Sequence, residues 1–153
     1  IQAKNAPLDR LEELTMIDDF SIEDINKLSH YITIYGDGSI NINTAPKEVL
    51  SSLCCDGNGN PLGDEAAKEI ITYRGGENGK IKPIENITDF LDQDKSGLNF
   101  SPEKKEILKS REVQSSYYKA NPSAEVNGVK KEISAVINFN QDTAPKYLYW
   151  YED

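Results

Sequence analysis

The dipeptide Asn127–Gly128 constrains the fold of this chain more than any other short feature. It stands between two runs in which apolar residues alternate with other residues, 115–126 and 129–139. Asn-Gly between such runs is the strongest short signal for a β-hairpin with a two-residue turn. The cross-strand pairs expected from this turn are Val126 with Val129, Ala120 with Ala135, and Tyr118 with Ile137.

A third strand is expected at residues 146–153, which makes residues 111–153 a small three-stranded antiparallel sheet. Pro122 cannot donate a ladder hydrogen bond, so its strand is expected at a sheet edge or with a local bulge. A one-residue slip would turn the buried side chains to solvent, and a sheet this short needs cover on its apolar face. One face of the middle strand is expected to hold Ile133, Ala135, Ile137 and Phe139. In the last strand, Leu148 and Trp150 are expected on one face and Tyr147, Tyr149 and Tyr151 on the other.

Residues 1–110 have a different pattern, of short helices separated by turn clusters. The clearest helix spans residues 64–76, with Gly75–Gly76 at its end. Helix starts are expected at Ser21, Thr44, Asp64 and Ser101, and Asp24 completes a capping box with Ser21. The fold class is therefore α+β, with a helical domain at 1–110 and a sheet domain at 111–153.

The helical part is acidic, with twenty acidic and twelve basic side chains in residues 1–110, a net charge of −8 out of −9 for the chain. Such a surface repels phosphate, which argues against nucleic acid and anionic membranes, and it is compatible with divalent cations. No apolar run is long enough to span a membrane. The chain begins at Ile1 without an initiator Met, so it is expected to be a piece of a longer protein with any anchoring segment upstream.

Residues 91–108 contain the spacing of a calcium loop, D-x-[DNS]-x-[DNS]-G-x5-E. Calcium prefers six to eight hard oxygen ligands, and alternate residues of such a loop point inward. Gly97 permits the sharp turn. The expected ligands are Asp92, Asp94, Ser96, the backbone carbonyl of Leu98, and Glu103. The alternative is an ordinary turn before a helix, because Asp and Ser also favour turns and Glu103 suits a first helical turn.

A second, less complete candidate for calcium lies at residues 55–65. Asparagine and acidic side chains alternate there too, but no acid occupies the twelfth position of the loop. A Gly/Asn-rich turn explains the same residues equally well. The candidate ligands are Asp56, Asn58, Asn60, Asp64 and Glu65.

The sequence offers little support for catalysis. His30 is the only histidine, and no catalytic motif for a nucleophile, a zinc site or a phosphate loop occurs. Cys54 and Cys55 are adjacent and cannot link distant segments; buried thiols are expected rather than a strained disulfide between neighbours. We therefore expect no enzymatic activity.

Two stretches resemble the type II secretion system protein K family, the largest minor pseudopilins. The first is residues 36–50, "GDGSININTAPKEVL", preceded by "NAPLDRLEEL" and "YITIYG". The second is the ending 115–153, with its aromatic strand, Gly turn, apolar strand and a final strand that ends in a Trp and an acidic residue. The resemblance covers nearly the whole chain and has both halves in the family's order.

The resemblance implies a pilin-like protein, in which an N-terminal membrane helix continues into a periplasmic helix that packs on an antiparallel sheet. A helical domain is inserted before the last strands, and that domain is associated with bound Ca²⁺. Such a protein is a periplasmic domain anchored in the bacterial inner membrane. It lies at the tip of the pseudopilus with minor pseudopilins I and J, and it helps to start the fibre that exports folded proteins.

The alternative is a DNA-binding helix-hairpin-helix module of the DNA-uptake type, which residues 41–74 also resemble. Such modules hold phosphate with backbone N–H groups of a tight glycine hairpin. Here the hairpin position is longer and acidic, so the scaffold is expected without the DNA-binding function.

Overall fold

The computed structural model describes residues 5–54, 60–75, 83–139 and 144–152, and its fold is α+β as predicted. Its contacts divide the chain into two compact units. One unit is Gly38–Ser115, and the other combines Ile1–Asp37 with Ser116–Asp153. This grouping differs from a division at residue 110, because the first and last segments of the helical unit pair with each other and the first 37 residues group with the sheet.

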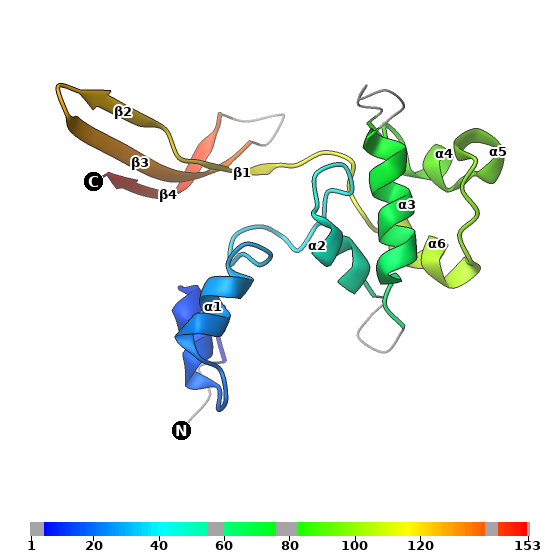
Figure 1. Cartoon of the computed structure of the whole chain (residues 1–153), viewed down its shortest axis with the longest axis horizontal. Coiled ribbons are helices and arrows are strands. Elements are labelled where there is room, and N and C mark those ends of the chain that lie inside the picture. Colours follow the sequence, from blue (N-terminus) through cyan, green and yellow to red (C-terminus); the bar gives the residue numbers. More distant parts are fainter. Residues whose placement is uncertain (1–4, 55–59, 76–82, 140–143, 153) are drawn as a thin grey trace. The chain divides into compact units, whose positions relative to one another are not determined.

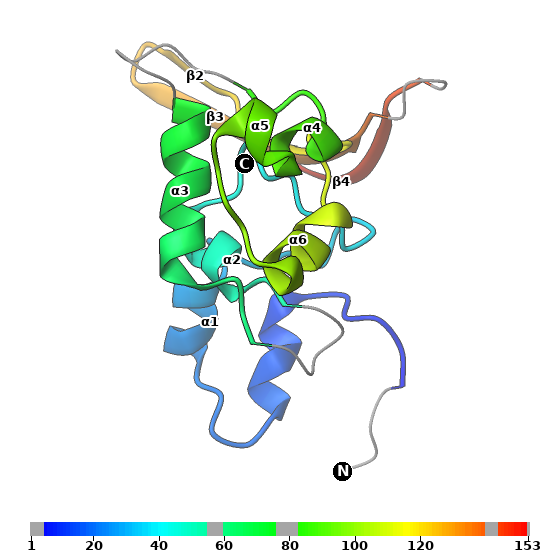
Figure 2. The same ribbon diagram turned by 90° about the vertical axis from the view of Figure 1, so that its right-hand side faces the viewer.

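The helical unit contains one long helix and four short ones. The long helix is α3 (Gly63–Gly75). In Figure 1, α2 lies to one side of α3, and the other three lie to its other side; Figure 2 shows the same helices turned by 90°. The short helices are α2 (Lys47–Ser52), α4 (Ile87–Leu91), α5 (Gln93–Ser96) and α6 (Pro102–Lys109).

An apolar core holds these helices together, because helices of four to eight residues are not stable alone. The inner face of α3 is apolar: Ala66, Ala67 and Ile70 are buried, while Ile71 and Tyr73 pack partly against the core. The buried members of the core are Ile42, Ala45, Leu50, Leu53, Leu62, Ala66, Ala67, Ile70, Ile84, Phe90, Leu91, Phe100, Ile107 and Leu108.

Two of the predicted helix starts are confirmed, and two lie differently. Ser21 accepts from the Asp24 amide in a capping box, and Ser101 accepts from the Lys104 amide ahead of Pro102. The prediction that Thr44 caps a helix is wrong, because the chain makes a turn there and α2 begins only after Pro46. Asp64 lies inside the first turn of α3, which already begins at Gly63.

The other unit begins with a small helical pair, the 3₁₀ helix η1 (Leu11–Met16) and the helix α1 (Ile22–Leu28). Ile25 is the buried side chain of α1, and η1 buries none. In the described part of the chain, no helix is both long and apolar enough to cross a membrane.

The sheet is built around β3 (Val129–Asn138), to which β1 (Tyr117–Ala120), β2 (Ser123–Val126) and β4 (Lys146–Glu152) all pair antiparallel. Asn127 and Gly128 have φ values of +54° and +79°, as a two-residue primed turn requires. The three predicted cross-strand pairs all occur. The hairpin signal therefore fixed both the turn and the register.

Two irregularities change the predicted sheet. The first strand of the hairpin is divided into β1 and β2 at Asn121–Pro122, so the sheet has four strands rather than three. A register shift between Val136 and Ile137 brings Tyr147 opposite Ile137, and the Tyr147 ring contacts the Trp150 ring with 5.6 Å between centroids. The predicted grouping of Tyr147 with Tyr149 and Tyr151 is wrong, because the bulge reverses the side-chain alternation.

The register gives the sheet one mainly apolar face. Side chains of directly opposed residues lie on the same face of an antiparallel pair. Trp150 lies opposite Ala135 and is 54% exposed, and Tyr147 is 60% exposed. This face holds Tyr118, Ala120, Ala124, Val126, Val129, Ile133, Ala135, Ile137, Tyr147 and Trp150, and also the charged residues Lys131 and Glu152.

Candidate functional site

The predicted calcium loop begins where α4 ends and α5 starts, and Asp92 belongs to both helix ends. The Asp92 carboxylate caps α5, and its Oδ1 accepts a hydrogen bond of 3.0 Å from the Asp94 amide. The sequence folds this way because a short acceptor side chain satisfies an amide that a helix start leaves unpaired. Asp92 and Asp94 are both exposed.

Ser96 and Gly97 complete the turn. Ser96 Oγ donates to the Asp92 carbonyl at 3.0 Å and accepts from the Leu98 amide at 3.1 Å. Gly97 has φ +76°, in the left-handed region that glycine enters without steric cost. The glycine expected to make the sharp turn therefore makes it, and Asp92, Asp94, Ser96 and Leu98 lie in one continuous turn.

Glu103 lies on the next helix, in the first turn of α6. Its Oε2 accepts a hydrogen bond of 2.8 Å from Ser101 Oγ. That bond, together with the Glu103 amide, lowers the pKa of the Glu103 carboxyl below its ordinary value. Glu103 is therefore ionised at neutral pH, which a calcium ligand requires, but its carboxylate is bonded to Ser101 and not to the Asp92 turn.

The donor set fits calcium chemically, because it consists of carboxylate, hydroxyl and carbonyl oxygens. Its geometry is not yet that of an assembled site. Within residues 5–54, 60–75, 83–139 and 144–152, no three His, Cys, Asp or Glu side chains converge on a point that could hold a metal ion. A bound ion would need Glu103 to leave Ser101 and turn toward Asp92.

The second candidate lies only partly in the described chain. Asp56 and Asn58 fall outside the described residues, and Asn60 is exposed. Asp64 forms an ion pair of 2.6 Å with Lys47, and this hydrogen bond lowers the pKa of the Asp64 carboxyl. Glu65 is exposed in the first turn of α3. Asp64 thus joins the start of α3 to the start of α2.

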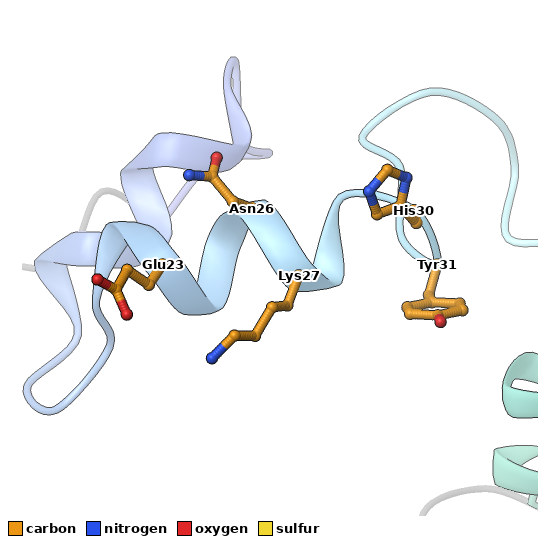
Figure 3. A pocket seen from close by; sticks show the side chains of 5 residues that line it. All are labelled: Glu23, Asn26, Lys27, His30 and Tyr31. Carbon is orange, nitrogen blue, oxygen red and sulfur yellow. The ribbon is translucent and has the colours of Figure 1, made fainter.

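A hollow of about 540 Å³ lies along α1 and just beyond its end. The five side chains that line it fan out from the chain rather than converge on one point (Figure 3). His30 is exposed, and its ring contacts the ring of Tyr31 edge-on at 6.5 Å between centroids. The arrangement does not present a general base with an orienting partner. The lining residues are Glu23, Asn26, Lys27, His30 and Tyr31.

A second hollow, of about 470 Å³, lies between the last turns of α3 and the start of α4. Its charged lining includes Asp89 and Lys95, whose Oδ1 and Nζ atoms are 2.6 Å apart. The hydrogen bond to Asp89 raises the pKa of Lys95 above its ordinary value. Lys95 is therefore a cation within the predicted calcium loop, between Asp94 and Ser96, where it offsets part of the acidic charge.

Sequence reasoning did not identify the two residues that tie the helical unit together. Arg74 donates from its guanidinium to the Ile42 carbonyl at 2.5 Å and to the Ala45 carbonyl at 2.8 Å. Asn43 bonds with its side-chain amide to both the N–H and the carbonyl of Ile84. The sequence does not predict the bonding partners of Arg74 and Asn43, because those partners lie far away in sequence.

The fold defines a class of protein, an α+β chain with a helical unit followed by a four-stranded antiparallel sheet. Residues 40–108, nearly the whole helical unit, match the family described as type II secretion system (T2SS), protein K. Over these residues, the match confirms the resemblance to the type II secretion system protein K family that was stated from the sequence. The match supports a role in type II secretion and protein transport. No curated protein and no solved structure matches the chain.

Proposed function

We propose that this chain is the periplasmic part of a minor pseudopilin, which acts at the tip of the pseudopilus in its assembly and in protein export. The single observation that carries the proposal is the family match over the helical unit, residues 40–108. The role is structural, and its chemistry is binding rather than catalysis. The protein would be anchored in the bacterial inner membrane by a helix outside the described residues.

The amphipathic sheet supports a pilin-like arrangement. Its apolar face carries aromatic side chains that are about half exposed, among them Trp150 and Tyr118. Exposed apolar area of this kind costs free energy in water, at about 25 cal/mol per Å². A long helix packed along β3, as in pilin-like proteins, would remove that cost.

The partners we propose are the minor pseudopilins I and J, and family membership supports an interaction with components of the secretion system. The test is a pull-down in which the protein's periplasmic part is the bait and the periplasmic parts of I and J are the candidates. Recovery of both partners is the expected result. If neither partner is recovered, whether Ca²⁺ is present or absent, the assembly role is refuted.

Calcium is the ligand we propose for the helical unit, bound by Asp92, Asp94, Ser96, the Leu98 carbonyl and Glu103. The ion would join the turn after α4 to the start of α6 and replace the bond between Glu103 and Ser101. Stability would then rise with free calcium by about 2.7 kcal/mol at a hundredfold excess over the dissociation constant. A further ion near Asp64 is a weaker proposal, because Lys47 already neutralises that carboxylate.

A thermal melt in excess Ca²⁺ against a melt in chelator tests the calcium proposal. The helical signal is expected to melt at a higher temperature with Ca²⁺, and Asp92→Asn should abolish the difference. Asn99→Ala is the matched control, since Asn99 is exposed in the same loop and supplies no proposed ligand. An unchanged midpoint in excess calcium would refute the proposal.

DNA binding is the rival function, and the acidic charge of the helical part opposes it. Asp64 and Glu65 stand at the start of α3, where a DNA-binding module would present phosphate-binding amides. A gel shift at low salt separates the two functions. We expect no shift, whereas binding that weakens steeply with added salt would favour the rival.

A further inference from the structure

Two segments about seventy residues apart in sequence pair at the boundary of the helical unit. The Ile42 amide donates to the Glu112 carbonyl at 2.9 Å, and the Glu112 amide donates to the Ile40 carbonyl at 2.9 Å. Asn41 and Glu112 form an isolated parallel bridge. We name residues 40–43 and 112–115 the clasp, because the chain enters the unit through one segment and leaves through the other.

Side chains reinforce the clasp on both sides of this bridge. Asn43 Nδ2 donates to the Val113 carbonyl at 2.9 Å and also to the Ile84 carbonyl at 2.8 Å. Asn41 Nδ2 donates to Ser115 Oγ at 2.8 Å. Asn43 thus joins three segments: the incoming one, the outgoing one, and the residues just before α4. All three bonds of these side chains are partly buried, so water competes with them only in part.

Every buried member of the helical core lies between the two segments of the clasp or within it. The core runs from Ile42, which is itself a clasp residue, to Leu108, at the end of α6. α6 leads into the clasp within a few residues. An apolar core fixed at its two chain ends can lose its packing in one step, because separating the ends frees the first and last core residues together.

We infer that the clasp makes residues 38–115 one cooperative unit. When the clasp is broken, this unit unfolds as a whole and the sheet stays folded. The unit is expected to unfold cooperatively because most of its helices are short. The stability of such helices comes from the shared core and not from each helix separately. Cooperative units of this kind often coincide with compact parts of a fold. The inference does not depend on the proposed role in secretion.

Hydrogen exchange on the full chain tests this role of the clasp. The variant is Asn43→Ala, which removes the central side chain of the clasp. Protection is expected to fall by one common factor, about 30-fold, at amides throughout the unit, such as Leu50, Ile70 and Leu108. This factor corresponds to about 2 kcal/mol at the tenfold change per 1.4 kcal/mol that applies at room temperature. Protection at Val136 and Trp150 in the sheet should not change.

Two other outcomes would overturn the inference. A loss confined to amides near Ile84 and Val113 would make Asn43 a local tether. An equal loss in β3 and β4 would make the whole chain one cooperative unit. If Asn43→Ala does not fold, Ser115→Ala removes the bond that Ser115 Oγ accepts from Asn41 and keeps the Asn43 bonds, and it should give the same uniform pattern with a smaller factor. Asn99→Ala is the matched control, because its side chain is exposed, and it should leave protection unchanged.

Discussion

Arg74 is the side chain whose removal should most clearly expose how the helical unit is held together. Its guanidinium donates to two carbonyls in the turn before α2, those of Ile42 and Ala45. Burial lowers the pKa of the Arg74 guanidinium, but an arginine remains charged at neutral pH. Hydrogen bonds from a charged donor contribute about 1.5–3 kcal/mol each. Because Arg74 is only half-buried, we expect about 2–4 kcal/mol for the pair.

This loss is large relative to the stability of the unit. About eighty residues at 0.05–0.15 kcal/mol per residue give about 4–12 kcal/mol in total. Arg74→Met should therefore lower the melting temperature of the helical signal by about 8–32 °C, at roughly 4–8 °C per kcal/mol. Arg74→Lys should lie between wild type and Arg74→Met, since an ammonium does not present two donors in one plane. Circular dichroism at 222 nm, in heat and in urea, measures both variants.

Lys68→Met is the matched control, because Lys68 is an exposed cation on the same helix, α3. It removes the same charge and a similar length of side chain without touching the two carbonyls. We expect its melting temperature to stay within a few degrees of wild type. If Arg74→Met and Lys68→Met melt together, the reasoning from hydrogen bonds to the turn is refuted.

Three further variants test other parts of the structure. Ile70→Ala should cost about 2–5 kcal/mol in a urea melt, because Ile70 is 0% exposed and its loss leaves a cavity in the core. Ser21→Ala should cost about 1 kcal/mol through the lost cap of α1. Ser21 also lowers the pKa of Asp24 below its ordinary value of 3.8, so the stabilisation is present above that value and is lost as pH falls through the lower, folded-state pKa. An NMR titration of Asp24 should show its pKa rise in Ser21→Ala. Gly128→Ala should cost about 1–2 kcal/mol at φ +79°, measured as lost amide protection in β2 and β3.

Each of these expectations has a result that contradicts it. A loss below 1 kcal/mol for Ile70→Ala would mean that the core is not tightly packed at α3. An unmoved titration of Asp24 in the Ser21 variant would remove the capping box as the cause of the shift. Unchanged protection in Gly128→Ala would mean that the turn does not need a left-handed residue.

The sheet was more predictable than the helical unit, because its determinants are local in sequence. Asn127–Gly128 fixed a turn type, and the turn type fixed the register over ten residues of β3. Pro122 marked the point where the first strand divides. The bulge that moves Tyr147 had no signal, because the alternation of KYLYWYED looks regular and the extra residue appears only when β4 pairs with β3.

Within the helical unit, the long helix α3 and the start of α6 at Ser101 followed from the sequence, but the connections between helices did not. Thr44 is a good helix cap by residue type, yet the chain turns at 41–45 and α2 starts later. Tertiary bonds from Arg74 and the Asn43 bonds to Ile84 determine that turn. Both partners are distant in sequence, and single-sequence patterns do not encode such pairings. The proposed calcium loop shares this property, since the spacing of Asp92 and Glu103 does not reveal that the Glu103 carboxylate bonds to Ser101.

The two outer strands of the sheet differ in how well they resist unwanted pairing. On one side, Pro122 interrupts the row of backbone donors between β1 and β2. On the other, β4 pairs only with β3 among the described residues, and its charged residues stand at its ends, Lys146 and Glu152. Five uncharged residues, three of them tyrosines, run between those charges, and long uncharged outer strands readily recruit further strands into aggregates. The protein should therefore aggregate through β4 as its concentration rises. The substitution Tyr149→Lys should reduce this aggregation, because it places a charge in the middle of the strand.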